Sequence, residues 1–566
     1  MEHFTALLYR LWQKASSLRC LLPTIFALLL CFSLLRALQG VNIYDDGFVL
    51  SAYALVFTSP GSVAYSFLYY WQIIFGGLWY TCLGDLGIYG FRLLEIAVLL
   101  LNAVLVARLS GMAGIHKACV AMAIIFAFSR LYWIEVFEYN TFSAFVALSV
   151  SLLMMKAFVR QSCLLMFFAG TVFGLGVFIR LPNVALSLLL LSLIPYHRIA
   201  NYPPRTLRMA LFAIAGALVG ILSTLVFMSA MGHLPYFEEA LADASFLVGN
   251  STNSHGSGNM LYALAVNYAH VGVGFIVFSL CPVLYTVLYA KCKTTSTRRM
   301  LVVLLFIIHV LMVIKFSSQT LFMMNAMCIA SCFYVGYVCR DDMRMVCLAS
   351  LAFLMSVALP LGSDWNITTL GVHNIWLALP LVPYAALLWV RKFSGYSRAV
   401  HVSFIAVTLV LLLARNAYGT FRPAYYEHGA RPDDTYRVNH PRVNVLTDQK
   451  TASDLDGLLA AMRTEVSEGD TVLTAGSFPM LHYLTLTRTY LHNSWPWIFG
   501  ADYCRHRFNE ARAEGAPLPV VVCSRVDIAA DRNRGDVFMK FLRDNRYATI
   551  YSNDSYLLLV PPRVRR

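Results

Sequence analysis

The residue pair best suited to chemistry is Asp45-Asp46, within the segment Asn42–Phe48. It follows the first long apolar stretch by only a few residues, and ionisable groups so close to a membrane boundary are costly and usually functional. Two adjacent carboxylates repel each other, so either the pKa of one is raised or both are held by a cation or by hydrogen-bond donors. Either state suits removal of a proton from an acceptor hydroxyl or amine. The alternative is an acidic pair in a loop that simply faces water.

The elements that must position this pair are apolar. Of the 566 residues, 59% are hydrophobic and 13% are charged, and the mean hydropathy is +0.64. A water-soluble fold of this size could hardly cover so much apolar surface, so a membrane is the expected solvent. The net charge of +14 comes from small clusters between apolar runs rather than from one basic face, which argues against nucleic acid as a partner.

A window of about 20 apolar residues predicts a polytopic α-helical membrane domain, residues 1–415, with about thirteen spans. The predicted spans are 21–39, 91–109, 118–134, 141–158, 163–179, 183–196, 209–231, 261–290, 300–315, 319–338, 344–361, 370–390 and 399–414. Lys and Arg cluster after every second span, which places those loops inside. The outer loops are then 40–90, 130–140, 232–260 and 362–369, and the C-terminal region is also outside.

Two regions outside the spans have distinct patterns. The loop 40–90 is rich in aromatic residues and poor in charge, so we expect interfacial amphipathic helices there. Residues 416–566 predict a soluble outer-face α/β domain, with a helix at 452–466 and strands at 471–475, 520–524, 548–551 and 556–560. Cys504 and Cys523 lie in this domain, either as free thiols or as a disulfide.

Across its first two-thirds the sequence resembles the GT-C superfamily of membrane glycosyltransferases, in particular the protein O-mannosyltransferase and lipid A aminoarabinose transferase branch. The matching stretches are Tyr44–Phe48 and Gly84–Arg92, together with the number of spans and the outer C-terminal region. The resemblance implies an inverting transferase that moves a sugar from a polyprenyl-phosphate donor to a glycan, lipid or protein acceptor at the outer face. Where that branch commonly carries a further charged element in the first loop, this chain reads Ala64–Trp71, so the sugar and the acceptor are not predicted.

By this resemblance Asp45 is the base that deprotonates the acceptor, and Asp46 orients it or binds acceptor or donor. The leaving lipid phosphate needs fixed cations or hydrogen-bond donors. Arg180 and Lys315, at predicted outer span ends, are the candidates for this phosphate contact, with snorkelling to the interface as the alternative for each. Arg92 is similarly placed and is a third candidate, although anchoring of the helix start is favoured for it.

Two outer loops carry candidates for the sugar or acceptor pocket. Glu138, Tyr139 and Asn140 follow the third predicted span, and Asp364 lies in the loop beside an aromatic residue. The alternative for both loops is an ordinary solvated surface. No metal-ligand spacing is found, and a divalent cation is left open because some members of the superfamily bind one.

A transporter or flippase of lipid-linked sugars is the alternative function, since it would also need many spans and buried cations. Transporters commonly show repeated halves, and no such repeat is visible in the sequence. The enzyme is therefore the favoured hypothesis. The expected location is a bacterial inner membrane, with the C-terminal domain in the periplasm.

Overall fold

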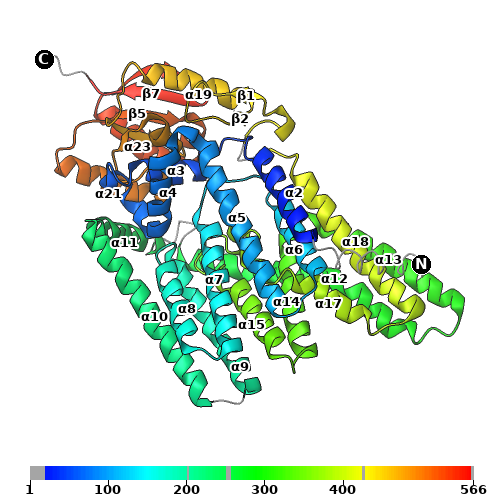
Figure 1. Ribbon diagram of the computed structural model, residues 1–566. Coiled ribbons are helices and arrows are strands. Elements are labelled where there is room, and N and C mark those ends of the chain that lie inside the picture. The colour runs from blue at the N-terminus through cyan, green and yellow to red at the C-terminus, as the bar shows by residue number, and fades with distance from the viewer. Residues whose placement is uncertain (1–19, 201–202, 250–255, 424–426, 563–566) are drawn as a thin grey trace.

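The apolar windows fold as helices, the arrangement in which a chain in lipid satisfies its own backbone hydrogen bonds. In the computed structural model, which describes residues 20–200, 203–249, 256–423 and 427–562, these helices form a bundle below a smaller α/β region (Figure 1). The apolar helices of the bundle are α2 (Leu21–Arg36), α5 (Gly87–Met112), α6 (Lys117–Arg130), α7 (Tyr139–Arg160), α8 (Cys163–Gly176), α10 (Pro203–Ala230), α12 (Ser257–Tyr289), α13 (Thr295–Lys315), α14 (Thr320–Val338), α15 (Met343–Ala358), α17 (Leu381–Val390) and α18 (Gly395–Gly419).

Six helical segments of the described chain are long and apolar enough to cross a membrane. Two of them, Pro60–Met112 and Thr295–Val338, join more than one helix. Four further apolar helices, α2, α8, α15 and α17, have 10–17 residues. The fold is thus compatible with a multi-pass membrane protein, and the total of about thirteen crossings stays a prediction.

Two predicted spans are not single α-helices. The window 183–196 falls on a 3-10 helix, η3 (Leu181–Ser192), followed by the short α9 (Leu193–Ala200). In the window 370–390, Gly371 has a φ of 57° and the continuous helix α17 begins only after Pro380. A left-handed glycine and a proline both interrupt helical hydrogen bonding, which hydrophobicity alone does not reveal.

The closest helix pair of the bundle is α8 with α10, and glycines make it close. Gly170 and Gly174 on α8 face Gly216 and Gly220 on α10, a small-xxx-small pattern on both helices. A Cβ atom added at Gly170 would overlap the carbonyl of Ala213. Without side chains at these positions, the two backbones pack directly against each other.

The first loop of the chain folds into α3 (Asp45–Leu55), η1 (Pro60–Tyr69), α4 (Tyr70–Leu83) and η2 (Gly84–Leu86). Helices were expected here, but α3 is not an amphipathic interfacial helix, because every residue from Asp46 to Leu55 is buried. It packs against α4 on one side and against α20 (Met480–Thr485) of the C-terminal region on the other. The covering of α3 by that region explains why the helix shows no polar face.

The C-terminal α/β region contains a five-stranded sheet in the order β4-β3-β5-β7-β6. Its strands are β3 (Thr471–Ala475), β4 (Arg488–Thr489), β5 (Val520–Ser524), β6 (Ala548–Ser552) and β7 (Tyr556–Val560). β3 pairs in parallel with β4 and β5, whereas β7 pairs antiparallel with β5 and β6. The strand predictions at 471–475, 520–524 and 556–560 are confirmed, as is the helix near 452–466, which is α19 (Gln449–Met462). Cys504 and Cys523 are buried free thiols.

Polar and apolar contacts join the two layers. Phe48 and Tyr65 of the first loop share one buried core with Trp497 and Phe499 of the C-terminal region. The helix α11 (Leu234–Gly249) forms an ion pair with α21 (Ala501–Ala513), in which Arg507 Nη2 lies 2.7 Å from Asp243 Oδ2. Figure 1 shows α11 directly under α21, so the sheet region rests on one end of the bundle.

Candidate functional site

Asp45 and Asp46 are the first two residues of α3, and their side chains have opposite environments. Asp46 is 1% exposed, whereas Asp45 is exposed to solvent. Asp46 Oδ1 accepts a hydrogen bond from the Val136 backbone N–H (3.3 Å), and its Oδ2 lies 3.4 Å from Arg92 Nη2. One carboxylate of the pair is therefore fixed inside the protein and the other is accessible from solvent.

Arg92, on the first turns of α5, holds the segment that leads into the acidic pair. Its guanidinium donates to the backbone oxygens of Ala37 and Gln39 (both 3.0 Å) and of Gly40 (2.8 Å), and its side chain is fully buried. These partners favour the anchoring role over contact with a donor phosphate, because a phosphate would have to displace them.

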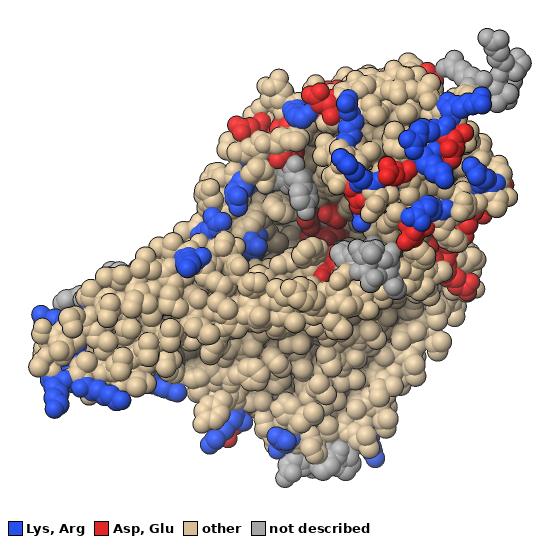
Figure 2. Space-filling model, turned by 180° about the vertical axis from the view of Figure 1, so that it is seen from behind, with Lys and Arg blue, Asp and Glu red and all other residues tan. Residues whose placement is uncertain are grey.

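Further carboxylates surround Asp45. Glu135, Glu138 and Asp364 come from two separate loops, and Figure 2 shows acidic side chains inside a hollow between the α/β region and the bundle. Enclosure by protein raises the pKa of Asp45 to about 7, and the charges of Glu135 and Asp364 act in the same direction. Water reaches the exposed Asp45 side chain and moderates this effect, so the upward direction of the shift is what matters for its chemistry. A carboxylate with a raised pKa is a stronger base than a free one.

The two glutamates of the loop before α7 are held by local donors. Trp133 Nε1 donates to Glu135 Oε1 (3.0 Å), and Asn140 Nδ2 donates to Glu138 Oε2 (3.2 Å). Burial raises the pKa of both glutamates, and their proximity adds to the rise at Glu138. Burial therefore favours the protonated form of both glutamates relative to the free side chain.

Arg180 lies on the same side of the bundle as these acids and is 4% exposed. Its guanidinium donates to Asn140 Oδ1 (3.5 Å) and to the backbone oxygen of Leu361 (3.4 Å). Tyr139 and Tyr69 are stacked with ring centroids 4.8 Å apart, and both lie within electrostatic range of Arg180 and of Asp45. Asn140 and the tyrosine pair thus connect the acid to the cation.

Seven of the predicted site residues therefore lie in one region together with the anchor Arg92: Asp45, Asp46, Glu138, Tyr139, Asn140, Arg180 and Asp364. Lys315 does not join them through any hydrogen bond or ion pair of the described residues. It is exposed at the C-terminal end of α13, next to Phe316, which packs with Ile367 in the segment that follows Asp364. The phosphate contact expected of Lys315 therefore stays a prediction.

Sequence reasoning missed two members of the site. Tyr69 lies in the aromatic segment Ala64–Trp71, where no site residue was predicted, yet its ring stacks on Tyr139 in the site. Glu95 lies one turn after Arg92 on α5, is 4% exposed and accepts a hydrogen bond from Thr141 Oγ1. An acidic residue inside an apolar helix was the available signal for Glu95.

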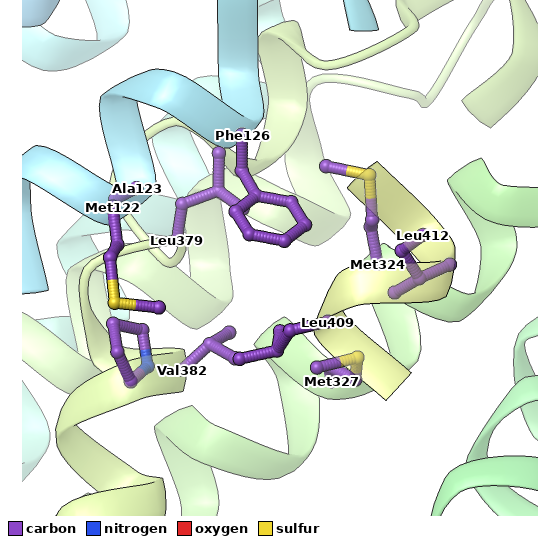
Figure 3. A pocket seen from close by; sticks show the side chains of 10 residues that line it. Met122, Ala123, Phe126, Met324, Met327, Leu379, Val382, Leu409 and Leu412 are labelled. Carbon is purple, nitrogen blue, oxygen red and sulfur yellow. The ribbon is translucent and has the colours of Figure 1, made fainter. Parts of the chain in front are cut away.

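Other features of the described chain offer less chemistry. No group of three or more His, Cys, Asp or Glu side chains in the described part could hold a metal ion. A small cavity of about 20 Å³ between α6, α14, α17 and α18 is lined by apolar side chains, among them Met122, Phe126 and Leu412 (Figure 3). Since none of its labelled side chains is ionisable, this cavity is a packing gap rather than a reaction site.

Comparison with known proteins does not assign the site. The chain matches no family model and no curated protein.

Proposed function

We propose that the chain is an inverting membrane glycosyltransferase of the GT-C type, which transfers a sugar from a polyprenyl-phosphate donor to a glycan, lipid or protein acceptor. The observation that carries the proposal is the solvent-accessible Asp45, which shares a region with the cation of Arg180 while its neighbour Asp46 is fixed by Arg92. The acceptor needs a base, for which Asp45 is the candidate, and the leaving phosphate needs a cation, for which Arg180 is the candidate.

In the proposed reaction the Asp45 carboxylate takes the proton of the acceptor hydroxyl or amine. The acceptor atom then bonds to the anomeric carbon while the bond from that carbon to the phosphate oxygen breaks, which inverts the configuration. The electron pair of the broken bond stays on the polyprenyl phosphate. Arg180 is the proposed partner of this charge, because fixed cations in an enclosed site stabilise developing charge without reorganisation.

The remaining predicted residues receive secondary roles. Glu138, Asn140 and Asp364 are the proposed hydrogen-bonding partners of the sugar or acceptor, and Tyr139 offers a ring face to the sugar. Lys315, exposed at the C-terminal end of α13, stays a second candidate for the phosphate contact.

The bundle offers apolar space for the prenyl chain. A cavity of about 650 Å³ is lined mainly by apolar side chains of α12, α14, α17 and α18, including Phe278 and Trp389. Near the N-terminal part of α12, Asn267 donates to the backbone oxygen of Trp365, the residue after Asp364 (2.9 Å). The same helix therefore runs from the acidic region to the apolar cavity.

The proposed topology follows the charge pattern. About thirteen crossings would place the α/β region and the acidic hollow on the outer face, which is the periplasm for a bacterial inner membrane. In Figure 2 a broad band without charge crosses the bundle, and basic side chains gather along its lower edge and at one end. An uncharged band bordered by Lys and Arg suits a bilayer with that edge inside.

The test is sugar transfer by the purified full chain in lipid nanodiscs, with a panel of radiolabelled polyprenyl-phospho-sugars. Asp45→Asn should lower the transfer rate by about 10²- to 10⁴-fold, the usual contribution of a general base, with donor binding retained. Asp85→Asn is the matched control, because Asp85 is an exposed acid of the same loop. Equal rates for wild type and Asp45→Asn would refute the assignment of the base.

The same purified protein distinguishes the glycosyltransferase hypothesis from the flippase hypothesis. Reconstituted in vesicles, wild type that moves the labelled donor across the bilayer but transfers no sugar to any acceptor would favour the flippase. In that case Asp45→Asn should leave the movement unchanged, since translocation needs no proton acceptor.

A further inference from the structure

The backbone leading into the acidic pair is held from two opposite sides. From the bundle, Arg92 binds the carbonyls of Ala37, Gln39 and Gly40. From the C-terminal region, the backbone oxygen of Arg431 accepts a hydrogen bond from the Gln39 side-chain amide (3.4 Å), and Glu427 accepts one from the Val41 N–H (2.7 Å). The segment therefore has hydrogen-bond partners in both layers.

The contacts from the C-terminal region form a short ladder. Leu446 N–H donates to the oxygen of Leu38, and Gly40 N–H donates to the oxygen of Leu446, each at 2.7 Å. Gln39 and Leu446 thus form a parallel β-bridge. At Val41 the ladder changes partner, because its N–H donates to a side chain, Glu427 Oε1, at 2.7 Å.

Glu427 is an unusual residue to find at this place. It is 7% exposed, and the same oxygen also accepts the hydroxyl of Thr447. Burial raises the pKa of Glu427 to about 7, and the neighbouring Asp434 and Asp448 act in the same direction. Burying a carboxylate is costly, and the donors that Glu427 satisfies belong to two segments, one of which ends in Asp45-Asp46.

We propose that Glu427 is a positioning residue for the acidic pair: by accepting the Val41 N–H it fixes the segment that sets where Asp45 lies. This inference rests on the proposed glycosyl transfer for its functional consequence but not for its geometry. Val41 is four residues from Asp45. Between them, the backbone oxygen of Ile43 accepts a hydrogen bond from the Met480 N–H (3.3 Å). The C-terminal region therefore binds the segment on both sides of Asn42. A displacement of about 1 Å at a reacting group can lower a rate by about 10²-fold.

Hydrogen–deuterium exchange of the full chain in nanodiscs tests the geometry without any substrate. In Glu427→Ala we expect the amides of residues 38–48 to exchange about fivefold to tenfold faster, as the loss of one uncharged hydrogen bond predicts. Glu427→Gln keeps an acceptor oxygen and should stay within about threefold of wild type. Asp502→Asn is the control, because Asp502 is an exposed acid of the same region, paired with Arg505.

Thr447→Val provides a second, milder variant should Glu427→Ala not fold. It removes the hydroxyl that orients the Glu427 carboxylate and should raise exchange at residues 38–48 by a few-fold, whereas Thr447→Ser should not. Unchanged exchange in a folded Glu427→Ala protein would overturn the proposal. So would an equal rise throughout the C-terminal region, because Glu427 would then only stabilise its own domain.

Transfer kinetics give the functional readout. Glu427→Ala should lower kcat at least tenfold with little change in KM, and Glu427→Gln should restore most of it, because the acceptor oxygen rather than the charge positions the segment. The expected exchange pattern together with no transfer by wild type would support the positioning contact and reject the glycosyltransferase. Transfer unaffected in Glu427→Ala would reject the positioning role and leave the glycosyltransferase standing.

Discussion

Replacement of Arg92 by methionine tests the buried clamp behind the acidic pair. Methionine has a similar length and fills the space, but it cannot donate to the three backbone oxygens or pair with Asp46. Arg108→Met is the matched control, since Arg108 lies on the same helix and is exposed.

The expected loss of stability follows from these contacts. Three buried carbonyls that lose a donor cost about 1 kcal/mol each, and the unpaired Asp46 adds about 1 kcal/mol, in line with the 3–5 kcal/mol typical of breaking a buried ion pair. At about 2 °C per kcal/mol for a large chain, a loss of about 4 kcal/mol lowers Tm by about 8 °C.

The pH dependence sharpens the prediction. Burial raises the pKa of Asp46 to about 7 in wild type, even though Arg92 opposes the rise. A carboxyl whose folded pKa is raised stabilises the fold at low pH, and that contribution is lost as pH rises through the folded value. Without Arg92 the pKa rises further, so the Tm difference between wild type and Arg92→Met should grow from pH 6 to pH 8.5.

The assay is thermal unfolding in nanodiscs, followed by a thiol-reactive dye at both pH values. A Tm change below about 2 °C for Arg92→Met, or a difference from wild type that shrinks with rising pH, would refute the reasoning about the clamp. Arg108→Met should stay within about 1 °C of wild type at either pH.

Three further predictions concern the base, the bundle and the contact between the layers. Because the pKa of Asp45 is raised and its charged form is the proposed base, log(kcat/KM) for transfer should rise with pH up to about 7 and then level; a flat profile between pH 5 and 8 would contradict this. Gly170→Leu should lower Tm by several degrees, because the α8–α10 backbones must separate, whereas Gly272→Leu, in open space on α12, should not; equal Tm values would show that the close approach is unimportant. Arg507→Met removes the partner that lies 2.7 Å from Asp243, and should expose the C-terminal region to limited proteolysis at lower protease concentration; an unchanged digestion pattern would argue against this contact as a tie between the layers.

Much of the fold was accessible from the sequence because it is encoded locally. The strands at 471–475 and 520–524 are short runs of β-branched and apolar residues, and the structure has them with the predicted bounds. The long apolar helices follow from hydropathy in the same way. Where local backbone chemistry interrupts the pattern, as at Gly371 and Pro380, hydropathy failed because it ignores φ and missing amide donors.

The candidate site was only partly accessible. Asp45, Arg180 and Asp364 could be selected because charges at the edge of apolar segments are costly wherever they lie. The same rule selected Lys315, for which the described residues show no hydrogen bond or ion pair to the acidic pair or to Arg180, so its role stays a prediction.

The sequence by itself therefore determined the apolar helices, the strands of the C-terminal region and a set of costly ionisable groups. Only the tertiary structure decided which of those groups meet, that Asp46 is buried while Asp45 is exposed, and that Glu427 reaches Val41 across the chain. The reason is physical: helix and strand preferences depend on the free energy of burying neighbouring residues, which a short window contains. A contact between distant residues depends on how whole elements pack, and no local pattern encodes that.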